Sequence, residues 1–193
     1  FEVHYSCRPV RGSLAVRVDG TLVETINTFC KKPEYMVKSV QTKLGKHTVE
    51  LKVLGGLSYV YGASFERNQS GVVVDGLGVG ALNIHMISRL KPRIFEAGTK
   101  ARDYDLVMIH TGTNMWAPKR PPQWAKAAIS LIRKSLGPDV SILLMSPPDF
   151  RDKKTKKPHV RMADCSREKR RIARNEKVAF WDFYHVMGGL GSI

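Results

Sequence analysis

The protein has 193 residues, with 32 Lys and Arg against 17 Asp and Glu, which gives a formal net charge of +15. Its composition, 42% hydrophobic and 25% charged, is that of an ordinary globular protein. The length suits one large domain or two small ones. No run approaches the roughly 20 apolar residues that a membrane-spanning helix needs, which excludes a protein built around such a helix.

Residues 1–69 predict an all-β unit. Apolar and polar residues alternate in short runs that recur every 8 to 12 residues or so, a pattern typical of a small β-sandwich. Asp19-Gly20 separates two of these runs and is a strong hairpin signal. The runs cover residues 1–7, 13–18, 21–29, 35–42, 47–54 and 58–66.

The cysteines and two tyrosines raise alternatives in this β region. Cys7, Cys30 and Cys165 have no metal-ligand spacing. Cys7 and Cys30 could pair in an oxidising compartment, and two unpaired buried thiols are an equal alternative. Tyr59 and Tyr61 could form a surface on which a sugar stacks, although packing within the unit is the favoured interpretation.

Residues 70–193 predict an α/β domain with a parallel sheet, because strand and helix patterns alternate. The unbroken apolar run Leu106–Ile109 predicts a strand buried on both faces. The loop from Gly76 to Gly80 fits neither a dinucleotide nor a P-loop fingerprint, so we expect a tight turn whose amides face a cleft. The predicted strands are 71–75, 106–109, 140–145 and 178–182, and the predicted helices are 81–90, 91–102, 121–136, 162–176 and 183–187.

The central strand of this region leads into a candidate site. It is followed by His110-Thr-Gly112-Thr-Asn114. Ligands bind at the carboxyl ends of parallel strands, and an Asn there can aim its side-chain NH2 at a developing oxyanion. Taken alone, Gly-Thr-Asn is more often a simple turn. Of the nearby histidines, His85 lies in an apolar helical pattern and is expected in the core, whereas His110 could reach the cleft.

Four sequence blocks in this order resemble the SGNH (GDSL-type) hydrolases, and most of all bacterial members with a β-sandwich inserted after the first strand. The blocks are residues 74–80, 109–114, 146–149 and 180–189. The resemblance implies a flavodoxin-like parallel sheet in residues 70–193 and a carbohydrate-binding-module-like sandwich in residues 1–69. It also implies an ester-hydrolysis site made from a Ser in Gly-Asp-Ser, a Gly, an Asn and an Asp-x-x-His.

The resemblance assigns roles to a few residues. It implies an oxyanion hole made by Asn114 and the backbone N–H of Gly80, with Gly112 in the turn that presents Asn114. The nucleophilic Ser is expected outside the chain, ahead of Phe1. Asp182 and His185 have the Asp-x-x-His spacing, but they follow a strand that is non-catalytic in the family. We therefore favour a helix cap there, with the true pair beyond residue 193.

The resemblance implies a fragment of an esterase that removes an acyl group, such as acetyl, from a carbohydrate such as a cell-wall polysaccharide. It also implies an extracytoplasmic location. No metal or organic cofactor is needed, because a Ser mechanism supplies its own nucleophile and base. The alternative is a non-catalytic glycan-binding protein on a degenerate hydrolase scaffold. Specific nucleic-acid binding is not expected, because the basic segment 151–177 lacks interleaved aromatic residues and suits a solvated surface.

Overall fold

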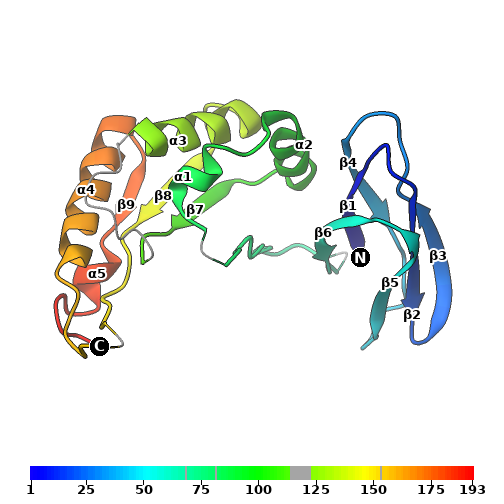
Figure 1. Cartoon of the computed structure of the whole chain (residues 1–193), viewed down its shortest axis with the longest axis horizontal. Helices are drawn as coiled ribbons and strands as arrows, with labels where there is room; N and C mark the ends of the chain where they lie inside the picture. Colours follow the sequence, from blue (N-terminus) through cyan, green and yellow to red (C-terminus); the bar gives the residue numbers. More distant parts are fainter. Residues whose placement is uncertain (68, 81, 114–122, 153) are drawn as a thin grey trace. The chain divides into compact units, whose positions relative to one another are not determined.

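The structure is a computed structural model that describes residues 1–67, 69–80, 82–113, 123–152 and 154–193. The chain divides into two compact units, Phe1–Leu77 and Gly78–Ile193, and each is considered by itself. Figure 1 gives the elements of both units. The described residues between 64 and 84 hold no strand or helix, and the predicted domain boundary after residue 69 lies within this stretch and stays a prediction.

The first unit consists of two three-stranded antiparallel sheets, in the orders β4-β1-β6 and β3-β2-β5. All the short runs predicted as strands in this region are confirmed as strands. They are β1 (Glu2–Cys7), β2 (Gly12–Val18), β3 (Thr21–Asn27), β4 (Glu34–Ser39), β5 (Val49–Gly56) and β6 (Tyr59–Ser64).

A shared core makes these sheets a sandwich. Val3 and Tyr5 of β1 pack in one cluster with Leu14 and Val16 of β2, and these four side chains are at most 6% exposed. Inward-facing residues from two sheets that interdigitate in this way define the sandwich architecture. The predicted turn between β2 and β3 is also confirmed, since Asp19–Gly20 both have positive φ, 51° and 81°, as a tight hairpin turn requires.

A disulfide joins Cys7 and Cys30, with 5.5 Å between their Cα atoms. The bond links the end of β1 to the segment after β3 and spans 23 positions of sequence. Of the two alternatives left open by the sequence, the structure therefore has the paired cysteines. Cys165 is free and lies in the second unit.

The second unit contains a parallel sheet in the order β7-β8-β9, and strand and helix alternate along its chain. The predicted strands near residues 106, 140 and 178 are confirmed, and so are the helices from residue 91 onward, although Pro121 and Pro122 lie outside the described residues. The elements are α1 (Ile84–Ile87), α2 (Pro92–Arg102), β7 (Leu106–His110), α3 (Gln123–Leu136), β8 (Ser141–Met145), α4 (Arg161–Glu176), β9 (Ala179–Trp181) and α5 (Phe183–Val186). None of the helices built from the described residues has the length and apolar character needed to cross a membrane.

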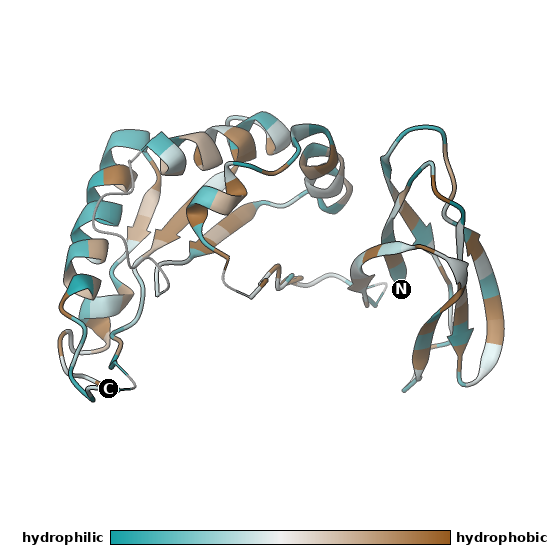
Figure 2. Ribbon diagram, in the orientation of Figure 1, coloured by the Kyte–Doolittle hydropathy of each residue, from teal (hydrophilic) through white to brown (hydrophobic). Residues whose placement is uncertain are grey.

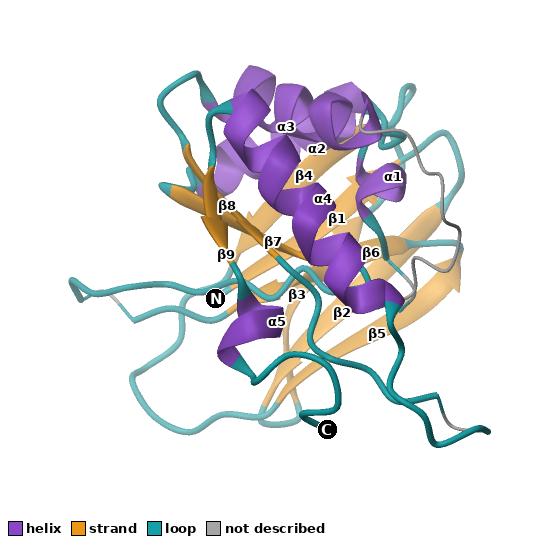
Figure 3. Ribbon diagram, turned by 90° about the vertical axis from the view of Figure 1, so that its left-hand side faces the viewer, coloured by secondary structure: helices purple, strands orange, loops and turns teal. Residues whose placement is uncertain are grey.

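One face of this sheet carries the core of the unit. Ile109, Ile142 and Leu144 are at most 4% exposed and pack against α3 and α4. The strands are largely hydrophobic in Figure 2, whereas α4 is mostly hydrophilic, and Figure 3 shows the same helices from the side. Burial of each such side chain contributes roughly 1.5–3 kcal/mol, which fixes α3 and α4 against the strands. The helical residues in this core are Ala125, Ala128, Ile129, Ile132, Ile172 and Ala173.

Side chains on the opposite face of the sheet are exposed, which contradicts a prediction. Leu106 and Met108 of β7 are 49% and 55% exposed, and Trp181 of β9 is 43% exposed. The prediction that residues 106–109 are buried on both faces is therefore wrong. The reason is that side chains alternate between the two faces of a strand, and the core formed with α3 and α4 lies on the face of Ile109, opposite to Leu106 and Met108.

The prediction of a strand at residues 71–75 is also wrong. These residues are not a strand, and Val72 and Val74 are 92% and 76% exposed. A parallel strand forms only where a neighbour pairs with its backbone groups, and no described residue pairs with this segment. The helix expected over residues 81–90 shortens to α1, which Asn83 caps by accepting the backbone N–H of His85 and Met86. Within the described residues the sheet thus has three strands where four were predicted, and the flavodoxin-like topology is only partly seen.

Replacing both Cys7 and Cys30 with Ala is expected to lower the free energy of opening of the β unit by about 3 kcal/mol, because the disulfide closes a loop of this length in the unfolded chain. Hydrogen exchange of the β1–β6 amides measures this loss. Cys165→Ala is the matched control and should leave these amides unchanged. Equal protection in the double variant and in the unaltered protein would contradict the prediction.

Candidate functional site

The turn after β7 is the described part of the predicted site, while Asn114 lies outside the described residues. Gly112 is buried and has a φ of +129°, a conformation that favours glycine. A Cβ at Gly112 would come 3.4 Å from side-chain carbons of Pro147. The turn Thr111–Thr113 therefore lies against the Ser146-Pro147 segment that follows β8, at the carboxyl edge of the sheet.

A buried lysine binds both strands at this edge. Lys169 of α4 is 5% exposed, and its Nζ donates to the carbonyl of Thr111 and, at 2.7 Å, to the carbonyl of Met145. The Thr111 hydroxyl lies 3.4 Å from the same nitrogen. One side chain thus links the end of β7 to the end of β8, and sequence reasoning missed it. Its only sequence signal was a Lys on the apolar face of the helix, three and four positions before Ile172 and Ala173.

Burial is the largest influence on the pKa values of Lys169 and His110 at this edge. Burial lowers the pKa of Lys169 to about 7, against an opposing effect of Cys165. Whether protonated or neutral, the amine keeps at least two donors for the two carbonyls. Partial burial and then the charge of Lys169 lower the pKa of His110, although a hydrogen bond with the Ser146 backbone acts the other way. His110 is thus at the carboxyl edge, where its ring meets Phe183 edge-on at 5.2 Å between centroids.

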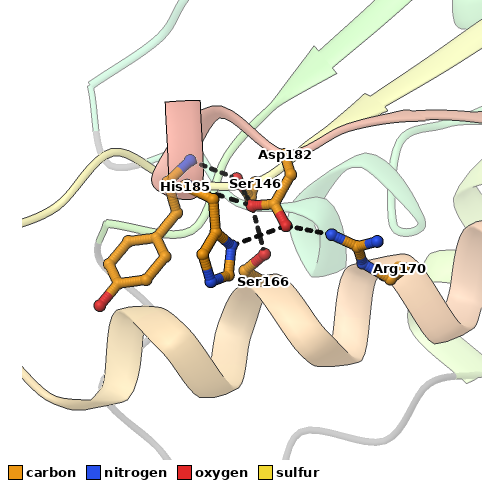
Figure 4. Close-up of polar contacts among 6 residues, drawn as sticks. Ser146, Ser166, Arg170, Asp182 and His185 are labelled. Atoms are coloured by element: carbon orange, nitrogen blue, oxygen red, sulfur yellow. Dashed lines mark hydrogen bonds and ion pairs between the residues drawn. The ribbon is translucent and has the colours of Figure 1, made fainter. Parts of the chain in front are cut away.

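Asp182, directly after β9, is the centre of a second polar cluster, which Figure 4 shows. Its Oδ1 accepts the hydroxyl of Ser166 at 2.7 Å and that of Ser146 at 3.3 Å. Its Oδ2 pairs with Nδ1 of His185 at 2.8 Å and with the guanidinium of Arg170. Burial by itself raises the pKa of Asp182, but the hydrogen bonds from Ser166, Arg170 and His185 outweigh it and leave the pKa well below its usual range.

The cluster allows two roles for Asp182. Its Oδ1 also accepts the backbone N–H of His185 at 3.4 Å, which caps α5. The contact with Nδ1 of His185 is the one by which a carboxylate orients a catalytic imidazole. Ser146 does not complete a triad, because its Oγ is fully buried, donates to Asp182 and accepts the N–H of Tyr184 at 2.8 Å. The predicted helix cap at Asp182 is thus present, and the catalytic pair, the less favoured alternative, is not tested by this geometry. Ser146, Ser166 and Arg170 are the partners that the sequence did not indicate.

Other predicted site residues lie elsewhere. Gly80 is in an exposed turn before α1, with open space where a Cβ would be, and its pairing with Asn114 stays a prediction. His85 stacks on Trp124 with 3.9 Å between centroids, as expected for a packing residue. In the first unit, Tyr61 stacks on Tyr35 at 5.6 Å. The guanidinium of Arg8 lies 3.9 Å from the centre of the Tyr59 ring, so protein covers part of each predicted sugar-stacking ring.

The basic segment is partly neutralised by its own acids. On α4, Arg167 pairs with Asp164 and Arg171 with Glu168, each three positions apart. Such exposed pairs contribute little to stability, but they reduce the net charge that the helix presents. Within the described ranges, no group of three His, Cys, Asp or Glu side chains is placed to hold a metal ion.

Comparison with known proteins gives a fold but no family. No protein-family model and no curated protein sequence matches the chain. A solved structure titled "Peptidoglycan O-acetylesterase in action, 5 min" matches with a TM-score of 0.61 and 19% identity, over 100% of this chain and 55% of that one. This chain therefore spans about half the length of that protein. The likeness shows that this chain shares the fold of the matched part of that structure.

A second solved structure is a salicylyl-acyltransferase from a tetracycline biosynthetic pathway. It has 18% identity and a TM-score of 0.37, over 96% of this chain and 68% of that one.

Asp182→Ala is expected to destabilise the second unit by about 2 kcal/mol, because it removes the cap of α5 and leaves Ser166 and Arg170 without their acceptor. Since the folded-state pKa is lowered, this contribution is fully present above about pH 4, the unfolded value, and is lost as the pH falls below it. Denaturant unfolding from pH 3 to 7, followed by tryptophan fluorescence, measures the effect.

Asp164→Ala on α4 is the control, because it removes an exposed carboxylate that also pairs with an arginine. This variant should lower the free energy of unfolding by less than about 1 kcal/mol. An equal loss in the two variants would show that the buried cluster is no more important than a surface ion pair.

Proposed function

We propose that the chain is part of an SGNH-type esterase that hydrolyses acyl esters, with acetyl groups on a carbohydrate such as a cell-wall polysaccharide as its substrate class. The observation that supports this most is the turn Thr111–Thr113 at the carboxyl edge of the sheet, which leads directly into Asn114. The fold is similar to that of a structure whose title names a peptidoglycan O-acetylesterase, which favours this substrate class.

In the proposed mechanism, a Ser hydroxyl from outside residues 1–193 attacks the ester carbonyl. The Asn114 amide and the Gly80 N–H donate hydrogen bonds to the oxyanion of the tetrahedral intermediate. An Asp–His pair takes the proton of the Ser and returns it to the alcohol that leaves, and water then hydrolyses the acyl-enzyme. Asp182 and His185 are one candidate for this pair, and a pair beyond residue 193 is the favoured one.

The β unit and its disulfide extend the proposal. A sandwich in the same chain as a hydrolase domain suits carbohydrate recognition, and the Cys7–Cys30 disulfide is compatible with an oxidising, extracytoplasmic compartment. The alternative is a non-catalytic glycan-binding protein. It is favoured by one observation, namely that Ser146 and Ser166, the two serines that donate to Asp182, are both fully buried and cannot act as nucleophiles there.

Asn114→Ala in the full-length protein is expected to slow hydrolysis of p-nitrophenyl acetate by on the order of a hundredfold, because it removes one oxyanion donor. The steady-state rate measures the loss. The reading frame on either side of this segment should also supply a Gly-Asp-Ser block upstream and a second Asp-x-x-His downstream.

Asn175→Ala is the matched control, since Asn175 is exposed on α4, and it should hydrolyse the ester at the unaltered rate. If Asn114→Ala is as fast as this control, Asn114 is only a turn residue. If the flanking sequence holds neither block, the glycan-binding alternative replaces the esterase. Strong salt-dependent retention on DNA would instead favour nucleic-acid binding, which the +15 charge permits.

A further inference from the structure

Burial of a lysine side chain at position 169 is unfavourable for the stability of the fold. Burial of an amine is unfavourable unless its donors are paired, and Met or Leu would fill an inward-facing helix position without that cost. Lys169 is 5% exposed, and its donors meet the carbonyls of Thr111 and Met145. The Thr111 carbonyl directly follows β7 and the Met145 carbonyl is at the last residue of β8, so Lys169 links the ends of two neighbouring strands.

The contact with Thr111 constrains the turn in a specific way. Because a peptide bond is planar, fixing the direction of the Thr111 carbonyl also fixes the direction of the Gly112 N–H. The next residue, Gly112, is buried with a φ of +129°, which favours glycine, and a Cβ there would be in ordinary contact with the Pro147 ring. The turn is thus held from α4 on one side and from the segment after β8 on the other.

The neighbours of Lys169 on α4 hold the third strand. Ser166, three positions earlier, donates to Asp182 after β9. The titratable groups that interact with the amine of Lys169 are Cys165 on its own helix and His110 at the end of β7. One face of α4 therefore binds the carboxyl ends of β7, β8 and β9, the edge at which ligands bind in parallel sheets.

We propose that Lys169 is a positioning residue of the hydrolytic site, which acts through the backbone of Thr111–Thr113 and sets the orientation from which the chain enters Asn114. This inference rests on the proposed esterase function. Lys169 does not touch the reacting atoms in this account. Its contribution is to hold the donor-bearing turn in one geometry before substrate arrives, which is how positioning at a distance affects the rate.

The test is Lys169→Met in the full-length protein, because Met keeps most of the volume and removes every donor. We expect kcat for p-nitrophenyl acetate to fall on the order of a hundredfold while KM stays within about twofold, since the substrate site remains but the turn is misplaced. In NMR spectra, the amide signals of Gly112 and Thr113 should move and those of β2 should not. Lys126→Met, an exposed lysine on α3, is the matched control and should change none of these.

A purely stabilising role predicts a lower melting temperature with unchanged kcat and unchanged signals of Gly112 and Thr113, and that result would overturn the proposal. If Lys169→Met does not fold, kcat and the NMR spectrum of Lys169→Arg are the test instead. Arg keeps hydrogen-bond donors, but it holds them in a planar group of different reach. An intermediate kcat with displaced turn signals supports the proposal, and an unaltered kcat overturns it. If the unaltered protein hydrolyses no ester, the esterase function fails, and the NMR signals still report whether Lys169 sets the turn.

Discussion

The buried amine of Lys169 is the contact on which the carboxyl edge of the sheet depends. Segments that leave neighbouring parallel strands have no ladder to hold them together, and their carbonyls need partners where water is excluded. Lys169 supplies donors to the carbonyls of Thr111 and Met145. Ser166 and Arg170 of the same helix bind Asp182 after the third strand. Helix α4 is therefore both a part of the hydrophobic core and the polar support of the edge.

The sequence predicted much of the fold because the information is local. Alternating residues identify β1–β6, and apolar runs and helical periodicity identify the elements from α2 onward. The strand expected at residues 71–75 is absent because a strand depends on a neighbour, which its own residues cannot specify. The exposure of Leu106 and Met108 was not predicted for the same reason, since local sequence does not say which face of a sheet is covered by helices.

The candidate site was less predictable for a related reason. The sequence identifies Gly112, Asp182 and His185 by spacing, and the structure gives the first a positive φ and brings the other two into contact. Lys169 meets Thr111 across 58 positions of sequence, and Ser146 meets Asp182 across 36. No spacing rule connects residues so far apart. The pairing of Cys7 with Cys30 was left open in the same way, because it depends on where the strands place the two thiols.

The central claim is that an ester oxyanion binds at the turn after β7. The most direct measurement is a crystal structure of the full-length protein after reaction with a p-nitrophenyl phosphonate ester, whose phosphonyl oxygen stands in for the oxyanion. The account predicts a covalent adduct with this oxygen about 3 Å from the amide nitrogen of Asn114. An adduct whose oxygen lies away from this turn, or a protein that forms no adduct, would contradict it.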